Sequence, residues 1–377
     1  MGKGTSASAV HPLRVLLKGG VLFVVLAFTF PVWGGALTRL STYNWIVGGR
    51  LRLPYGGGNP DAVYSSSMTD LGVMLRSHVA ARGKPAGEYR VIILGDSTVW
   101  GFSVPLENSL PFLLDAAGLT ACDGRAVRVY NLGYPNASVT KDLLILDEAM
   151  QYQPDLVLWF VTLAAMTPDR RFDHPIITGN LGELLAIQSA LALDLGIPEP
   201  ADAGGKDTFF DRRVALNEFV RFELYGLMWN ATGIDRELPD LAAVQRPALP
   251  GYVIYAGFLP PSLADDALSF DVIGAGVRLA GGTPVLLVNE PIYVQPDGPN
   301  TDIRYNASYP RWVYDEYRAQ FAARAEREGW TYLDLWDALP PAEFTPDADL
   351  HPTPEGEALL AEILAPYILQ IACGGGR

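Results

Sequence analysis

A short run of apolar, mostly β-branched residues, Arg90-Val-Ile-Ile-Leu94, ends at Gly95 and leads into a helical stretch. A run of this length without polar alternation is typical of a parallel strand that is buried on both faces. Further strands are expected at 126–132, 155–162, 285–289 and 331–335, and helices at 109–117, 139–150, 262–280, 310–328 and 355–371. Strands and helices therefore alternate along the chain. This alternation predicts an α/β fold in which a parallel sheet lies between two layers of helices.

The predicted domain covers residues 89–371 and contains one long insertion, 163–261. Leucine and isoleucine recur at helical spacing between 184 and 195, so the insertion begins with a helix. A second helix at 209–229 has two apolar faces, one with Val220, Leu224 and Leu227, the other with Phe222, Tyr225 and Trp229. Either both faces pack inside a lid subdomain, or one of them meets a partner protein or a bilayer surface.

The N-terminal region contains an uncharged stretch, residues 19–37, that is long enough to cross about 30 Å of hydrocarbon. We expect a retained transmembrane anchor, because this run is longer than the core of a usual signal peptide. A cleaved signal is the alternative, since Gly34-Gly35-Ala36 resembles a cleavage site. Residues 1–18 are then a cytoplasmic segment, and 38–88 a juxtamembrane linker around the turn-rich stretch 55–60.

The charge around the anchor does not decide its orientation. Basic residues lie on both sides of the uncharged stretch, namely Lys3, Arg14 and Lys18 before it and Arg39, Arg50 and Arg52 after it. The formal net charge of the whole chain is −14, which argues against a nucleic-acid partner.

The sequence contains no motif that is typical of a cofactor site or a metal site. The four histidines are scattered and the two cysteines are far apart, so no metal-ligand cluster is visible. No glycine-rich nucleotide loop follows a predicted strand. We therefore expect no cofactor and no metal.

The two cysteines, Cys122 and Cys373, follow the first and the last helix of the predicted domain. Both helices should end at the edge of the sheet opposite to the carboxyl ends of the strands. A Cys122–Cys373 disulfide is therefore predicted, and it would fit an oxidising compartment.

The strongest chemical signal is Gly95-Asp-Ser97, which stands between the first strand and a helix. A serine at this point lies at the carboxyl edge of the sheet, where open α/β folds bind their ligands. Backbone amides near the start of the helix can stabilise an oxyanion, and the N–H of Ser97 is the natural first donor. Ser97 is therefore the candidate nucleophile.

A serine nucleophile needs a base, and His351 is the histidine whose position fits. His11 precedes the apolar stretch, His78 precedes the first strand, and His174 lies in the insertion. His351 follows the last strand and should reach the same sheet edge as Ser97. Pro352 favours an extended backbone at His351, so Asp349, two residues earlier, is expected to orient the imidazole, with Asp347 in reserve.

These blocks resemble the SGNH (GDSL-like) hydrolase superfamily over about 89–162 and 283–371. The resemblance implies a three-layer, flavodoxin-like fold, with Ser97 as nucleophile, His351 as base and Asp349 as its partner. It makes Gly133, after the second strand, the second oxyanion amide, a position where a glycine allows close approach of the backbone.

Two positions depart from the family pattern. Ala348 stands where the family commonly has its aspartate, although Asp-x-His is also found among relatives. Leu163-Ala164 stands where the family has an asparagine that donates to the oxyanion. Thr162 and Asn289, both at strand ends, are the candidates to replace that donor.

The resemblance implies a serine esterase or O-acyltransferase that forms an acyl-Ser97 intermediate on acylated cell-envelope glycans or small esters. It also implies an extracytoplasmic domain held at the membrane by the N-terminal helix, with a membrane-bound O-acyltransferase as a possible partner. The alternative is a non-catalytic subunit of a membrane complex that has kept the fold after losing the asparagine.

Overall fold

The computed structural model describes residues 11–37, 41–55, 69–198, 209–232 and 244–374. Its centre is a five-stranded parallel sheet with the order β2-β1-β3-β4-β5. The strands are β1 (Glu88–Leu94), β2 (Ala126–Asn131), β3 (Leu156–Val161), β4 (Val285–Asn289) and β5 (Thr331–Asp334). This is the flavodoxin-like strand order, and it confirms the predicted α/β fold.

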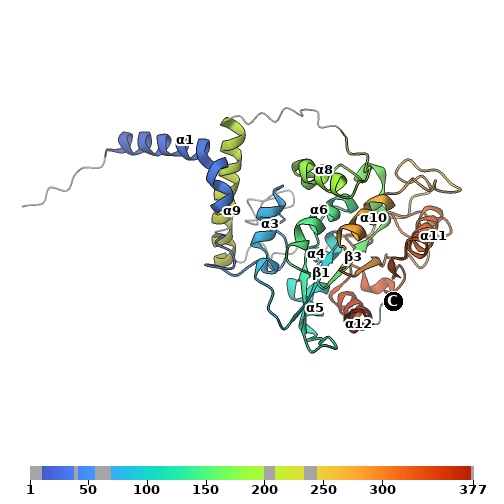
Figure 1. Cartoon of the computed structure of the whole chain (residues 1–377). Helices are drawn as coiled ribbons and strands as arrows, with labels where there is room; N and C mark the ends of the chain where they lie inside the picture. The colour runs from blue at the N-terminus through green and yellow to red at the C-terminus, as the bar shows by residue number, and fades with distance from the viewer. Residues whose placement is uncertain (1–10, 38–40, 56–68, 199–208, 233–243, 375–377) are drawn as a thin grey trace, which may run out of the picture.

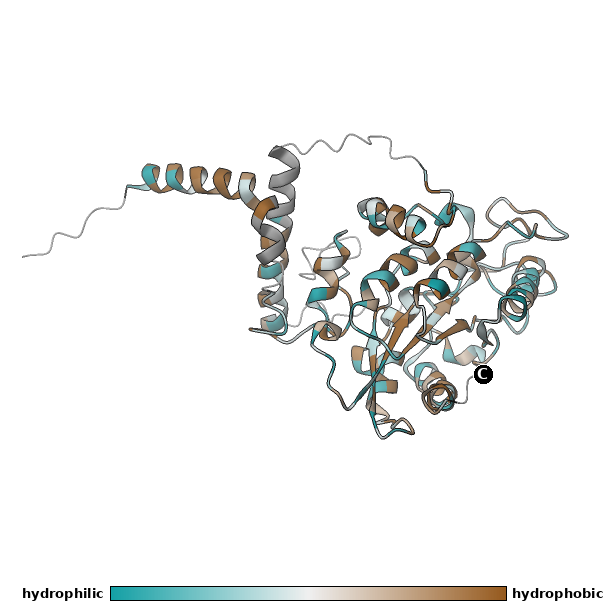
Figure 2. Cartoon of the chain, viewed as in Figure 1, coloured by the Kyte–Doolittle hydropathy of each residue, from teal (hydrophilic) through white to brown (hydrophobic). Residues whose placement is uncertain are grey.

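Helices cover both faces of the sheet (Figure 1). Along β1, Ile92 and Leu94 face one layer while Val91 and Ile93 face the other, because successive side chains of a strand alternate. The first layer contains α3 (Leu71–Ser77), α6 (Val139–Met150), α10 (Phe270–Leu279) and α11 (Arg311–Glu328), and the second contains α5 (Leu110–Ala116) and α12 (Pro354–Ala372). Figure 2 shows the apolar strands enclosed between these layers. The domain is therefore a three-layer sandwich.

One predicted boundary is wrong. The helix expected from residue 262 begins only at Phe270, because the residues before it form turns and the amide of Ser269 donates to the carbonyl of Met166. The insertion contains α7 (Pro175–Gly179), α8 (Leu181–Ala190) and α9 (Phe209–Thr232). Its two predicted helices are therefore present as α8 and α9.

The N-terminal helix α1 (Pro12–Leu37) projects away from the domain (Figure 1). Among the described residues, it is the one helix long and apolar enough to cross a membrane, over Pro12–Phe30. This window begins earlier than the predicted anchor, 19–37. Residues 1–10 of the predicted N-terminal segment lie outside the described residues. Near its end α1 packs against α9, where the rings of Phe30 and Phe219 lie 5.7 Å apart.

The region expected to be a juxtamembrane linker packs on the domain over its described parts, 41–55 and 69–88. Leu53 is fully buried, and its carbonyl accepts a hydrogen bond of 2.8 Å from the indole of Trp100. The Arg52 guanidinium lies 3.6 Å from the Trp100 ring. The turn-rich residues 56–60 lie outside the described part of the chain. The segment after α1 is thus fixed directly behind the helix that carries Ser97.

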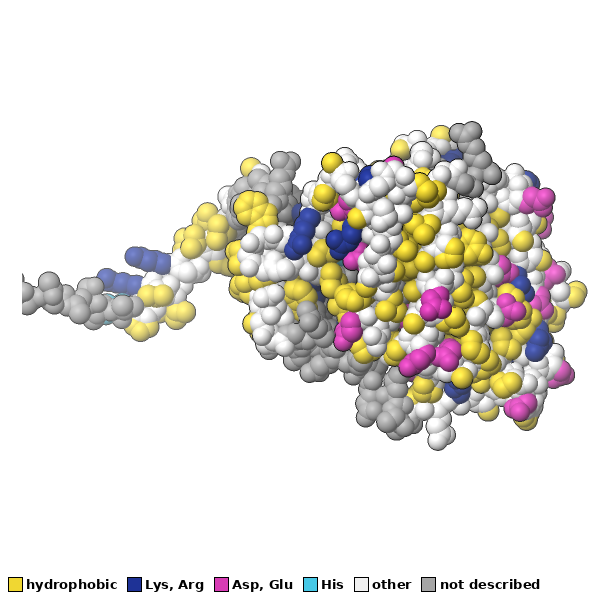
Figure 3. Space-filling model, turned by 90° about the horizontal axis from the view of Figure 1, so that it is seen from below, with side chains coloured by type: hydrophobic (Ala, Val, Ile, Leu, Met, Phe, Trp, Pro, Cys, Tyr) yellow, Lys and Arg dark blue, Asp and Glu magenta, His cyan; other side chains and the backbone are white. Residues whose placement is uncertain are grey.

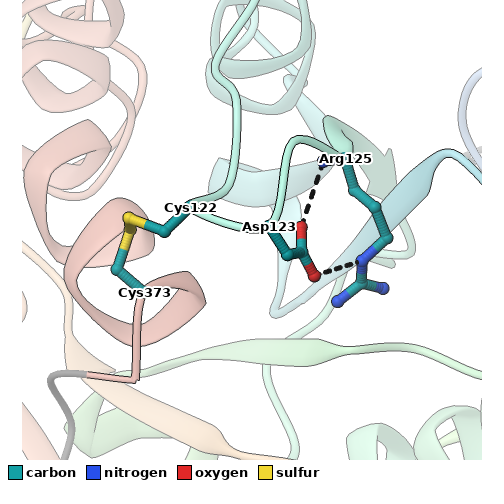
Figure 4. The surroundings of a disulfide bond; sticks show 4 residues. All are labelled: Cys122, Asp123, Arg125 and Cys373. Atoms are coloured by element: carbon teal, nitrogen blue, oxygen red, sulfur yellow. Dashed lines mark hydrogen bonds and ion pairs between the residues drawn. A yellow bond between two sulfur atoms is a disulfide. The ribbon is translucent and has the colours of Figure 1, made fainter.

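A disulfide joins Cys122 to Cys373, as the ends of the first and last helices of the domain suggested (Figure 4). Their Cα atoms are 4.9 Å apart, within the usual range for a disulfide. Next to Cys122, the carboxylate of Asp123 binds Arg125 across 2.7 Å. The Cys122–Cys373 disulfide ties α12, which follows the His351 loop, to the loop before β2.

Removing this disulfide is expected to lower the free energy of unfolding by about 2 to 5 kcal/mol, because it closes a loop of 251 residues in the unfolded chain. The measurement is denaturant unfolding of the wild type and of Cys122→Ser/Cys373→Ser. Reduced wild-type protein serves as the matched control and should unfold like the variant. Equal midpoints for oxidised wild type and variant would contradict the prediction.

Candidate active site

Ser97 is held at the carboxyl end of β1 by a tight turn into α4 (Ser97–Trp100). The Asp96 side chain caps this helix by accepting a hydrogen bond of 2.9 Å from the amide of Thr98. Gly95 is required in the turn, because a Cβ there would lie 2.6 Å from the Val99 side chain. Local sequence thus fixes the serine at the sheet edge.

His351 faces Ser97 from the loop before α12. Its Nε2 lies 2.9 Å from Ser97 Oγ. Two contacts hold the loop: the amide of Thr345 donates to the His351 carbonyl at 2.8 Å, and the hydroxyl of Thr98 donates to the Leu350 carbonyl at 3.2 Å. The second contact ties the loop directly to α4. The two residues predicted as nucleophile and base are therefore within hydrogen-bond distance.

Asp347, the reserve candidate, contacts the other side of the imidazole. Its Oδ2 lies 3.0 Å from His351 Nδ1. The predicted pairing of Asp349 with His351 is absent, since Asp349 Oδ2 accepts from the amide and hydroxyl of Ser308. The prediction assumed an extended backbone up to His351. Instead, the Thr345–His351 hydrogen bonds close the segment into a loop, which turns Asp347 toward the ring.

The Asp347 carboxylate accepts two further hydrogen bonds, which the sequence did not reveal. Ser103 Oγ donates to Asp347 Oδ2 at 2.7 Å and lies 2.8 Å from His351 Nδ1, and Thr345 Oγ1 donates to Asp347 Oδ1 at 2.5 Å. Burial alone would raise the pKa of Asp347, but the hydrogen bonds from His351, Thr345 and Ser103 hold it well below its usual range. Asp347 is therefore an anion near neutral pH, and it favours the tautomer with a proton on Nδ1.

A cavity of about 520 Å³ opens over these residues. Its lining includes Ser97 and His351, the aromatic rings of Tyr55 and Phe102, and Asn136. Tyr55 comes from the segment predicted as a linker. The cavity is therefore built partly from residues that precede the α/β domain in the sequence.

The amide of Gly133, which was the predicted second oxyanion donor, binds another group instead of facing the cavity. The N–H of Gly133 donates to the side chain of Asn131 at 3.0 Å. A Cβ at Gly133 would lie 2.7 Å from the backbone nitrogen of Trp100. The glycine is thus needed to pack the β2 loop against α4, and its amide is already occupied.

Neither candidate for the missing asparagine reaches the cavity. Thr162 Oγ1 pairs with the hydroxyl of Tyr309 at 3.0 Å. Asn289 donates to Asp334 at 2.7 Å and accepts from Tyr317 at 3.0 Å. Both side chains are buried parts of the packing at strand ends.

Asn136 carries the one side-chain amide among the described residues that line the cavity. It has a positive φ of 71°, a conformation that asparagine adopts more readily than most residues. The sequence signal was weak: an asparagine after Pro135, three residues beyond Gly133. Asn136 is the group best placed to act as a further donor.

A buried lysine joins the two loops beneath the cavity. Lys141 Nζ donates to the carbonyl of Gly95 at 2.9 Å and to that of Tyr134 at 2.5 Å, and it pairs with Asp142 at 3.0 Å. Burial raises the pKa of the neighbouring Glu290, and the charges of Asp96 and Asp142 add to this effect. Lys141 thus holds the turn before Ser97 and the loop before Asn136 in one arrangement.

The other histidines are not part of the site. Burial lowers the pKa of His78 and of His174 to about 4, so both are neutral near pH 7. Each accepts a hydrogen bond on Nδ1 from the amide two residues later and caps a short helix. Among the described residues, no group of three or more His, Cys, Asp or Glu side chains forms a metal site.

Several known proteins that resemble parts of this chain are esterases. No protein-family model matches the sequence. An arylesterase from Vibrio mimicus is 28% identical over 141 residues, which cover 36% of this chain and 68% of that protein. A carbohydrate acetylesterase family member from Sinorhizobium meliloti covers 76% of this chain and 99% of its own, with 13% identity and a TM-score of 0.34. An acetylxylan esterase from Geobacillus stearothermophilus, a catalytic mutant, covers 73% and 92%, with 13% identity and a TM-score of 0.36.

Proposed function

We propose that this protein is a serine esterase that works through an acyl-Ser97 intermediate. The observation that carries the proposal is the chain of hydrogen bonds from Ser97 through His351 to Asp347 at the floor of an open cavity. A serine, a base and a group that orients the base are the parts that nucleophilic acyl transfer needs.

In the first step, Ser97 Oγ attacks the ester carbonyl while His351 Nε2 takes the hydroxyl proton. The Asp347 carboxylate stabilises the imidazolium that forms. The carbonyl oxygen becomes an oxyanion, which accepts hydrogen bonds from the amide of Ser97 and from Asn136. When this intermediate collapses, His351 returns the proton to the departing alcohol and the acyl group stays on Ser97.

The second step uses the same residues, with water in place of Ser97 as the attacking group. Water enters, His351 removes its proton, and attack on the acyl-serine releases the acid and restores Ser97. A glycan hydroxyl in place of water would give transfer instead of hydrolysis, so O-acyl transfer is the second fate that we propose for the same intermediate.

We further propose that the domain faces the extracytoplasmic side and acts on acyl esters of the cell envelope. The disulfide between Cys122 and Cys373 supports this side, because disulfides persist in oxidising compartments. Figure 3 shows basic side chains near the outer end of α1, followed by apolar ones. The positive-inside rule does not choose between the two sides, because basic residues stand both before and after the apolar stretch.

A fluorophosphonate probe tests the proposal directly, because it forms a stable bond only with an activated serine. Intact protein is expected to take up one probe molecule, and digestion followed by mass spectrometry should locate it on the peptide that contains Ser97. Heat-unfolded protein is the control. If folded protein takes up no more label than unfolded protein, the non-catalytic alternative is preferred, in which the fold serves only for binding.

Asn136→Asp is expected to lower kcat by about 10²-fold or more, because a carboxylate beside the developing oxyanion repels it and removes a donor. Asn136→Gly is the matched variant, since it tolerates the positive φ and keeps the backbone amide. A loss in both variants assigns the donor to the side chain, and a loss in Asn136→Asp alone assigns it to the backbone. An Asn136→Asp variant with wild-type kcat would exclude Asn136 from the oxyanion site.

A further inference from the structure

The helix α9 presents an uncovered apolar face on the side opposite to its packed face. Phe222 and Trp229 are buried against the Tyr43 ring, at centroid distances of 4.9 and 6.2 Å. Gly226 lies between them, where a Cβ would be 2.5 Å from that ring. Residues two or five positions away from these lie on the other side of a helix. The packed face is therefore fixed and leaves the opposite face outward.

The outward face is apolar. It carries Val220, Leu224 and Leu227, and the Leu224 side chain is 53% exposed. Neither α8 nor the α/β domain covers this face in the described part of the chain. The sequence left two alternatives for α9. The exposure of Leu224 and its neighbours excludes the first, in which both faces of the helix are buried inside a lid subdomain.

The loop after α1 carries two more exposed apolar side chains next to α9. Trp45 and Ile46 are 79% and 74% exposed. The loop is attached to α9, because Glu223 accepts a hydrogen bond of 2.7 Å from the amide of Thr42. We call Trp45, Ile46, Val220, Leu224 and Leu227 the α9 patch.

The position of α1 indicates what covers the α9 patch. Figure 1 shows that the first turns of α1 project away from the domain and that α9 runs across their direction, and Figure 3 shows the same projection of α1. The two helices meet where Ala27 and Phe30 of α1 are buried against Phe219. If α1 crosses a bilayer, α9 lies along the surface of that bilayer.

We propose that the α9 patch rests in the interfacial layer of the same bilayer that α1 spans. The chemistry suits this site: leucine and valine side chains enter the acyl boundary, and an exposed tryptophan next to a membrane span is typical of the interface. Because α1 contacts α9 through Phe30 and Phe219, the bilayer that α1 spans lies next to the patch, and no separate partner is needed. The bilayer then holds the catalytic domain by two contacts, and the domain cannot swing freely about α1.

The test uses the full chain in nanodiscs of phosphatidylethanolamine and phosphatidylglycerol. Both native cysteines are in the disulfide, so a single added cysteine can be labelled with a polarity-sensitive fluorophore. The labelled variants are Leu224→Cys and Trp45→Cys for the α9 patch, Val24→Cys for the span, and Glu326→Cys on α11 as an exposed control. Lipids with a nitroxide near the head of the acyl chain serve as the quencher.

We expect the labels at 224 and 45 to emit at shorter wavelength than the label at 326 and to lose most of their intensity to the nitroxide lipids. The proposal is overturned if these labels behave like the one at 326, or if they are shielded from water but not quenched, which would mean that protein covers the patch. The label at 24 reports separately whether α1 spans the bilayer, and none of these readings depends on esterase activity.

Discussion

Ser97→Ala is expected to lower kcat for hydrolysis of an aryl acetate by about 10⁶-fold, because no other group can form the acyl intermediate. Ser97 Oγ is the atom within 2.9 Å of His351 Nε2 at the floor of the cavity. The alanine variant should fold normally, since the Ser97 hydroxyl has no role in capping α4, which is capped by Asp96.

Ser308→Ala is the matched control for Ser97→Ala, because Ser308 lines the same cavity and its hydroxyl donates to Asp349. Its loss of kcat should be orders of magnitude smaller. The measurement is steady-state hydrolysis by purified variants whose thermal unfolding matches the wild type. Retention of most of the activity by Ser97→Ala would refute the acyl-serine mechanism.

Asp347→Asn is expected to lower kcat by about 10³ to 10⁴-fold. The carboxylate accepts a hydrogen bond from the N–H at His351 Nδ1, which leaves Nε2 unprotonated and able to take the proton of Ser97. An amide can turn its NH₂ group toward Nδ1 and stabilise the wrong tautomer. Ser103, 2.8 Å from the same nitrogen, offers another acceptor and limits the loss.

Asp349→Asn is the matched variant, two residues away on the same loop. Asp349 binds Ser308 and lies 3.5 Å from Arg246, with no contact to the imidazole. We expect its kcat to stay within about tenfold of the wild type, because only loop packing changes. The same steady-state assay compares the two. A larger loss in Asp349→Asn than in Asp347→Asn would reverse the assignment of the two carboxylates.

The central strands β1, β3 and β4 were predictable because each contains a short apolar run that lies between helical segments. The edge strand β2 mixes polar and apolar residues, and its place in the alternation of strands and helices predicted it. The Cys122–Cys373 pair was predictable for a related reason: the strand order brings the ends of the first and last helices to one edge. Ser97 and His351 followed from the same topology, which brings the carboxyl ends of β1 and β5 to the opposite edge.

The loops were less predictable, because their side chains depend on contacts far away in the sequence. Asp349 was chosen by assuming an extended backbone, whereas hydrogen bonds to Thr345 close the loop. Gly133 and Asn289 do lie at strand ends, but a position at an edge does not say which way an amide points. The two apolar faces of α9 were visible in the sequence, but only the packing of Tyr43 shows which one is covered.

The two halves of the site lie 254 residues apart, and His351 directly precedes the last helix. A chain emerging from the ribosome therefore carries the serine long before its proposed base, and the two can pair only after the loop before α12 has been synthesised. A product that ends between residues 101 and 345 keeps the strand and helix around Ser97 but has neither His351 nor Asp347. Synthesis beyond His351 is thus itself a condition for forming the Ser97–His351 pair.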